Sequence, residues 1–322
     1  MEASTINLIF EVNYAVFAVF AALLITEIMG SVLLLLFWRE TKSRVLEYIV
    51  PIWEVTGTFG AFWVVTGDFA YPSLLVPVAK IFAALLTVFL ILFVARNASI
   101  VFAEFIIKRK WLDEVKLYKA YAISTIVLGL VVLVLLSSLV SGRGIDIPAG
   151  SFSISDWASS LGSWLFVLGT LLIGAGMAPV FYSILSMRRL TIPVTATGVA
   201  LSVLSYYVYS PAFISAWMAV PVALTLLACL LFFHERTLGV VTNKAVFLVL
   251  LTTVIFSLQF LVYPSAIGRT IPIDAVTTTG TMADAYLMIT LVGGILLAAM
   301  LVLYMNVAMR ARKLERVEGM KA

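Results

Sequence analysis

The sequence predicts an all-α, polytopic membrane protein, and three observations lead to this prediction. Of the 322 residues, 63% are hydrophobic and 12% are charged, whereas a soluble domain carries about a quarter charged residues. The mean hydropathy is +1.12. Apolar segments long enough to cross the ~30 Å hydrocarbon core of a bilayer recur along the whole chain. We count nine predicted spans, at 8–37, 47–69, 75–107, 116–141, 158–187, 190–209, 211–233, 243–264 and 283–309.

The distribution of lysine and arginine over the loops predicts the orientation. One face of the predicted topology carries most of these residues: Arg39, Lys42 and Arg44, the loop 108–119, Arg188 and Arg189, Arg236 and Lys244, and the tail 310–321. The loops of the other face contain only Arg143 and Arg269. By the positive-inside rule, the N-terminus is expected outside and the C-terminal tail in the cytoplasm.

No linker or soluble second domain interrupts the apolar pattern. We therefore expect one integral membrane domain over 1–322. It would contain two helix bundles of about four spans each, at roughly 8–141 and 158–264, and a final span at 283–309.

Four charged residues fall inside the first three predicted spans. Glu54 lies within the apolar segment 51–72, Glu27 lies in the first span, and Arg96 and Glu104 lie in the third. At ~1.5 Å per residue, Arg96 and Glu27 are both ~15 Å from the cytoplasmic ends of their helices, and Glu54 is ~10 Å deep. Because sequential spans joined by short loops normally pack together, these residues are expected to form a ladder from the cytoplasm toward mid-membrane.

The ladder has two interpretations. Carboxylates held away from water can bind and release protons near neutral pH, which suits a proton relay. Alternatively, Arg96 and Glu27 form a static interhelical ion pair, while Glu54 and Glu104 reach for lipid headgroups. Glu54 is the favoured functional residue because small residues follow it, which allows close helix approach. For Lys80, near an outer helix end, snorkelling to the interface is the simple explanation.

The composition also limits what this chain does by itself. Its one histidine, His234, is expected at a cytoplasmic helix end, so no buried imidazole pair is present to ligate haem. Its one cysteine, Cys229, has no partner for a disulfide or thiolate metal site. No metal cluster, activated nucleophile, phosphate-binding loop or nucleic-acid-binding surface is evident. The sequence therefore predicts no cofactor bound by this chain alone.

Several motifs resemble those of subunit II of cytochrome bd-type quinol oxidases. They are Thr26-Glu27, Pro51-Ile52-Trp53-Glu54, Ala70-Tyr71-Pro72, Tyr263-Pro264-Ser265, Thr277-Thr278-Thr279 and a last span that begins at Ala283 and ends in basic residues. Nine spans with an external N-terminus are also similar to that family. Three features depart from its pattern. Glu54 replaces an aspartate, Val55-Thr56 replaces Gly-Asn, and Gly30 stands where a second aspartate is expected. The pattern is that of a distant member.

The resemblance implies a haem-free subunit of a quinol:oxygen oxidoreductase in the cell membrane. Its partner would be a homologous subunit I that carries the haems and the quinol site, with small accessory subunits and a structural quinone or lipid as further components. It also implies a cytoplasmic proton pathway through Glu54, Glu27 and Arg96, with Glu104 nearby and with Thr26 and Trp53 as motif residues.

Two other classes of protein remain open at this point. One is the quinol-oxidising membrane anchor of a molybdenum or iron–sulfur reductase. The other is a secondary transporter, which the sequence favours less because Pro179 and Pro193 have no counterparts in the first half.

Overall fold

The computed structural model describes residues 3–105, 113–233, 235–263, 265–268 and 270–319. Some of the positions discussed above lie outside the described residues: 106–112 of the basic loop and of the third predicted span, His234, Pro264, Arg269 and the tail beyond 319.

The chain is built almost entirely of helices. These are α1 (Ala3–Leu36), α2 (Trp38–Ala70), α3 (Pro72–Ile81), α4 (Ala83–Phe105), α5 (Glu114–Ser141), α6 (Ile154–Ser159), α7 (Leu161–Phe181), α8 (Arg188–Tyr209), α9 (Ala219–Phe233), α10 (Glu235–Val241), α11 (Lys244–Ser257), α12 (Gln259–Val262) and α13 (Thr281–Gly319). Four short 3₁₀ turns, η1 (Leu185–Met187), η2 (Pro211–Phe213), η3 (Ala216–Met218) and η4 (Ile273–Ala275), connect them. The strands are β1 (Ile145–Asp146), β2 (Ser151–Phe152), β3 (Ser265–Ala266) and β4 (Ile271–Pro272).

The prediction of a helical, multi-span fold is confirmed, but the count of nine spans is not. Among the described residues, eight helical segments are long and apolar enough to cross a membrane. The predicted span at 243–264 is instead divided into α11, with 14 residues, and α12, with four. By length α11 rises ~21 Å, less than the ~30 Å core. Proline follows Tyr263 in the sequence, which disfavours a helical conformation at that residue and limits α12.

The third predicted span is also divided. The segment 75–107 was expected to be one helix, but α3 ends at Ile81 and the chain continues as α4 from Ala83. The segment 158–187 is likewise preceded by the separate helix α6 and becomes α7 only from Leu161. These corrections shorten the membrane-crossing part of each segment to a length near that of the hydrocarbon core.

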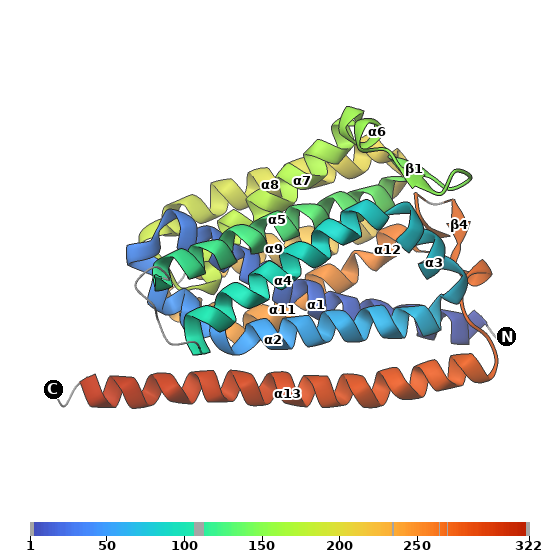
Figure 1. The fold of residues 1–322 in the computed structure, drawn as a ribbon. Coiled ribbons are helices and arrows are strands. Elements are labelled where there is room, and N and C mark those ends of the chain that lie inside the picture. Colours follow the sequence, from blue (N-terminus) through green and yellow to red (C-terminus); the bar gives the residue numbers. More distant parts are fainter. Residues whose placement is uncertain (1–2, 106–112, 234, 264, 269, 320–322) are drawn as a thin grey trace.

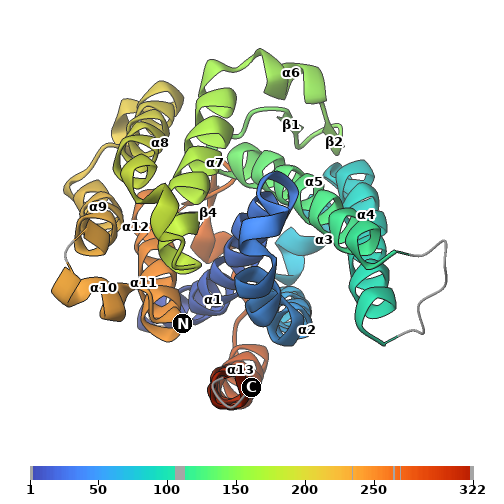
Figure 2. The same cartoon turned by 90° about the vertical axis from the view of Figure 1, so that its left-hand side faces the viewer.

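The spans run roughly parallel to one long axis (Figure 1). In the end-on view of Figure 2, α1 lies near the centre, and α2, α5, α7 and α11 surround it. Within its most apolar window α1 is 61% buried, whereas α4 and α13 are each 11% buried. Since α4 and α13 lie at the margin of the bundle, most of their apolar surface faces away from the rest of the chain.

The main hydrophobic cluster draws on both of the predicted bundles. It includes Leu23 of α1, Ile49 of α2 and Tyr121 of α5 together with Phe181 of α7 and Phe232 of α9. The halves of the chain are therefore joined through one interior.

Helices α7 and α8 approach each other closely because glycine lines their contact. A Cβ atom added at Gly198 would lie 2.6 Å from the backbone nitrogen of Ile173. One added at Gly169 would lie 2.7 Å from the backbone nitrogen of Ser202. Without an effective hydrophobic force between helices in lipid, such small-residue contacts let dispersion forces hold two spans together.

Two β-hairpins cover the end of the bundle at which the chain begins (Figure 1). Strand β1 pairs with β2 and β3 pairs with β4, both antiparallel. The β3–β4 loop and the segment after η4 also contact the spans, because Gly268 N donates a hydrogen bond to Leu139 O (2.8 Å) and Thr278 N to Ala70 O (2.8 Å). This end corresponds to the two loops predicted to be external, whereas the orientation in the membrane remains a prediction.

Candidate functional site

An ion pair lies inside the bundle, between α1 and α4. The Nη2 atom of Arg96 is 2.8 Å from Oε2 of Glu27, and the two side chains are 1% and 0% exposed. The structure thus brings together the two residues placed at equal depth by their sequence positions. Moving charges into hydrocarbon costs several kcal/mol per ion, so each of these residues needs the other.

Three more groups hold the ion pair in place. The hydroxyl of Tyr121, on α5, donates a hydrogen bond to Glu27 Oε2 (2.5 Å). Arg96 Nη2 also donates to the backbone carbonyl of Trp53 (3.2 Å), and its guanidinium lies 5.5 Å from the ring centre of Phe93. The cluster therefore joins α1, α2, α4 and α5.

The cluster is incompletely satisfied by the residues that the structure describes. Oε1 of Glu27 and Nε of Arg96 are both buried and have no hydrogen-bond partner there. Since a buried polar group normally has a partner, these two atoms are the places where a water molecule would be accommodated, accepting from Arg96 Nε or donating to Glu27 Oε1.

Thr26 anchors α1 beside the cluster. Its hydroxyl donates to Leu23 O (2.7 Å) and lies 2.9 Å from the hydroxyl of Tyr48. Its carbonyl accepts a hydrogen bond from the hydroxyl of Tyr182 (2.8 Å). Thr26 therefore fixes the position of α1 against α2 and the end of α7, and so sets the direction of the neighbouring Glu27 side chain.

The absence of a second acid at Gly30 has a steric reason. A Cβ atom there would collide with the hydroxyl of Tyr182 and would lie 2.9 Å from Ile49 Cδ1. Any side chain at this position would separate α1 from α2 and α7. The close contact of α1 with α2 and with Tyr182 therefore requires glycine where a carboxylate was expected.

The two remaining acids of the predicted ladder lie on the surface. Glu54 is exposed on α2, and Glu104 is exposed near the end of α4. Glu104 accepts a hydrogen bond from the hydroxyl of Tyr118, on α5. In this chain the ladder is therefore not one continuous set, because Glu54 does not join the ion pair.

Tyr118 and Tyr121 were missed by the sequence analysis, although both meet one of the predicted acids. They are three residues apart on α5, a spacing that places both side chains on one helix face. The signal would have been a pair of tyrosines at helical spacing, one to pair with the acid of the preceding span and one with the acid of the first span.

Glu54 belongs to a larger exposed face. On α2 the exposed residues recur at helical spacing: Glu54, Thr58, Ala61, Val65 and Asp68. Helices α4, α2 and α13 follow one another along this side of the bundle (Figure 2). The largest exposed apolar side chains on α4 and α13 include Ile91, Val94, Met288, Ile295 and Leu296. We call the exposed residues of these three helices the α2/α4/α13 face.

No metal site is evident in the described part of the chain. Within those residues, no group of three or more His, Cys, Asp or Glu side chains is close enough to hold a metal ion. Lys80 is exposed at the end of α3, with its Nζ near Gly150, which is the interfacial position expected of a snorkelling lysine.

The fold and the buried ion pair together define a helical membrane protein with a charged group held in its interior. No protein-family model matches the sequence, and the search of curated proteins found no match either. The fold, however, is similar to that of a solved chain from the bd oxidase of Geobacillus thermodenitrificans. The TM-score is 0.72 at 16% sequence identity, and the match covers 94% of this chain and 98% of the other. At this identity the similarity establishes a shared fold.

Proposed function

We propose that this chain is the haem-free subunit II of a cytochrome bd-type quinol oxidase. The observation that carries the proposal is the match of nearly the whole chain to a bd oxidase chain, with almost no unmatched residues on either side. The motifs around Thr26, Glu27 and Trp53 also support it, since Glu27 and the Trp53 carbonyl both bind Arg96 in the buried cluster and Thr26 packs beside them.

The haems and the quinol-oxidising site would then belong to a second, homologous membrane chain. We propose that this partner packs on the α2/α4/α13 face. Helices α4 and α13 are far less buried than α1, and an apolar face that carries the Glu54 carboxylate suits protein contact better than lipid contact. A structural quinone or lipid and small accessory subunits would complete the assembly.

The geometry supports a proton path that differs from the predicted ladder. Glu104 lies near the basic end of the bundle and is hydrogen-bonded to Tyr118. Tyr121, one turn further along α5 (~4.5 Å of rise), is hydrogen-bonded to Glu27. We propose that protons pass from Glu104 along Tyr118 and Tyr121 to Glu27, with water between the two phenols. Arg96 holds the Glu27 carboxylate in position at the inner end of this path.

Glu54 has a separate role in this proposal. Exposed on the α2/α4/α13 face, it would be covered by the partner and would pass protons across the contact between the two subunits. In this proposal Glu54 still passes protons, but at the contact with the partner subunit and not in the interior of this chain.

Co-purification tests the subunit role. An affinity-tagged chain, extracted from its own membrane in mild detergent, is expected to bring with it one further multi-span chain and the absorbance bands of haem. After separation of the two chains, the haem is expected to stay with the partner. Recovery with a soluble iron–sulfur subunit instead would favour the reductase anchor and reject the proposal.

A further inference from the structure

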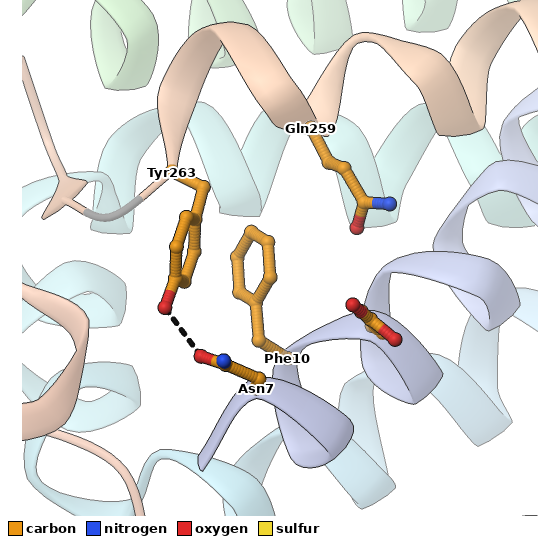
Figure 3. A pocket seen from close by; sticks show the side chains of 5 residues that line it. Asn7, Phe10, Gln259 and Tyr263 are labelled. Carbon is orange, nitrogen blue, oxygen red and sulfur yellow. Dashed lines mark hydrogen bonds between the residues drawn. The ribbon is translucent and has the colours of Figure 1, made fainter. Parts of the chain in front are cut away.

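A small pocket opens between the first turns of α1 and the end of α12 (Figure 3). Asn7, Phe10, Glu11, Gln259 and Tyr263 line it, and its volume is about 90 Å³. It lies far from the charge cluster, because Glu11 precedes Glu27 by sixteen residues of one helix, or ~24 Å. The pocket is at the membrane face where the chain begins, which the loop charges predict to be the outer one.

Gln259 indicates that the pocket holds a ligand. Its side chain is 1% exposed, and neither Oε1 nor Nε2 has a hydrogen-bond partner among the described residues. A buried amide without partners is costly, and native proteins rarely leave one unsatisfied. Whichever way the amide is turned, it offers one acceptor and one donor to the pocket. The missing partner must therefore accept as well as donate hydrogen bonds.

The other lining groups select the charge of the ligand. Glu11 contributes a carboxylate, and no lysine or arginine is among the lining residues. The Phe10 and Tyr263 rings lie 5.2 Å apart between centroids, and Tyr263 is held in place by donating its hydroxyl proton to Asn7 Oδ1. A carboxylate, an amide oxygen and aromatic rings are the groups that recognise an ammonium ion.

The size of the pocket and its location at the membrane face indicate which molecule supplies the ammonium group. A pocket of about 90 Å³ at the membrane face suits the few atoms of an ethanolamine end. Leu8, next to Asn7, is 46% exposed and offers an apolar edge for an acyl chain. The donor of Gln259 would meet an acceptor that a phospholipid supplies beside its ammonium group, namely a phosphate oxygen.

We propose that this pocket binds the headgroup of a phospholipid that carries a primary ammonium. The ammonium donates hydrogen bonds to Glu11 and to Gln259 Oε1, the Phe10 ring lies beside it, and Gln259 Nε2 donates to the phosphate. This site is independent of the proposed function, because it uses none of the residues of the charge cluster or of the α2/α4/α13 face.

Lipid add-back tests the site. The chain, purified with whatever partner accompanies it, is stripped of lipid in detergent. Phosphatidylethanolamine, phosphatidylcholine, phosphatidylglycerol or free ethanolamine is then added. Bound lipid is counted by native mass spectrometry, and the melting temperature is recorded for each. Phosphatidylethanolamine is expected to bind about tenfold more tightly than the other two lipids and to raise the melting temperature.

Two variants and a control complete the experiment. Glu11→Gln and Gln259→Leu are each expected to reduce phosphatidylethanolamine binding by about tenfold, whereas Asp274→Asn, at an exposed acid of η4 outside the pocket and outside the α2/α4/α13 face, leaves it unchanged. Without lipid, Gln259→Leu is expected to be at least as stable as the natural chain, since it removes an unpaired amide, so failure to fold does not obscure the result.

Three outcomes would overturn the proposal. The first is equal binding of all three lipids. The second is tight binding of free ethanolamine together with no lipid preference, which would make the pocket a site for a soluble amine. The third is normal binding of phosphatidylethanolamine by both variants.

Discussion

Glu27 and Glu54 lie on neighbouring helices, yet the chain treats them differently. Glu27 is fully buried, paired with Arg96 and hydrogen-bonded to Tyr121. Glu54 is exposed on the α2/α4/α13 face. The comparison teaches that an acid in an apolar span can be satisfied in two ways. It is paired inside its own chain, where it contributes to that chain's stability, or it is left for a neighbouring molecule, where it contributes to assembly.

The largest expected effect comes from breaking the interior pair. Arg96→Met leaves the Glu27 carboxylate buried without its counter-ion, and we expect it to lower the free energy of unfolding by about 3–5 kcal/mol. Thermal or denaturant unfolding of the purified chain in detergent would measure it. Arg39→Met, at an exposed position, is the matched control and should change little.

The double variant Glu27→Gln with Arg96→Met sharpens the same test, because it removes both charges. It should recover most of the lost stability. If Arg96→Met alone cost less than about 1 kcal/mol, the ion pair would not be the buried, mutually dependent unit described here.

A smaller effect is expected at Tyr121. Tyr121→Phe removes one hydrogen bond to a charged carboxylate, which is typically worth about 1.5–3 kcal/mol. The melting temperature should fall by less than in Arg96→Met. Tyr207→Phe, on α8 and 56% exposed, is the control. Equal shifts in the two variants would mean that the Tyr121 hydroxyl contributes nothing to the cluster.

Substitutions on the α2/α4/α13 face should impair assembly with the partner and leave the stability of the isolated chain unchanged. Ile295→Trp on α13 introduces bulk at a position that is 68% exposed. We expect it to leave the unfolding of the isolated chain nearly unchanged and to prevent co-purification of the partner. Leu230→Trp on α9, at 58% exposure, controls for the effect of bulk facing lipid. Partner recovery by both variants would place the contact elsewhere.

The smallest effect on stability is expected at Glu54. Glu54→Gln should change the free energy of unfolding of the isolated chain by no more than about 0.5 kcal/mol, because the side chain has no burial to lose. In the assembled complex the same variant should slow oxygen consumption. A large loss of stability in the isolated chain would show that Glu54 is held inside the chain after all.

Counting residues along helices was enough to place Glu27 and Arg96 together, because both depth and helix order are encoded locally. The direction in which the Glu54 side chain points could not be predicted in this way. It depends on how α2 is rotated against α1, which the packing of Gly30 against Tyr182 and Ile49 decides. The contribution of Tyr121 was equally hidden, since α5 meets α1 only in the folded bundle.

The break between α11 and α12 was missed for a related reason. Hydropathy alone does not distinguish one long helix from two short ones, and the segment 243–264 is predominantly apolar. The polar residue Gln259 and the proline that follows Tyr263 were the local signals for the end of the span.

The most direct test of the proposed proton path is the rate of oxygen consumption by the complex that carries Tyr118→Phe and Tyr121→Phe together. Both rings stay in place, and only the hydroxyls that link Glu104 to Glu27 are lost. At saturating quinol and oxygen, and per assembled haem, the rate should fall by about tenfold or more. An unchanged rate, with normal haem content, would contradict a path through α5.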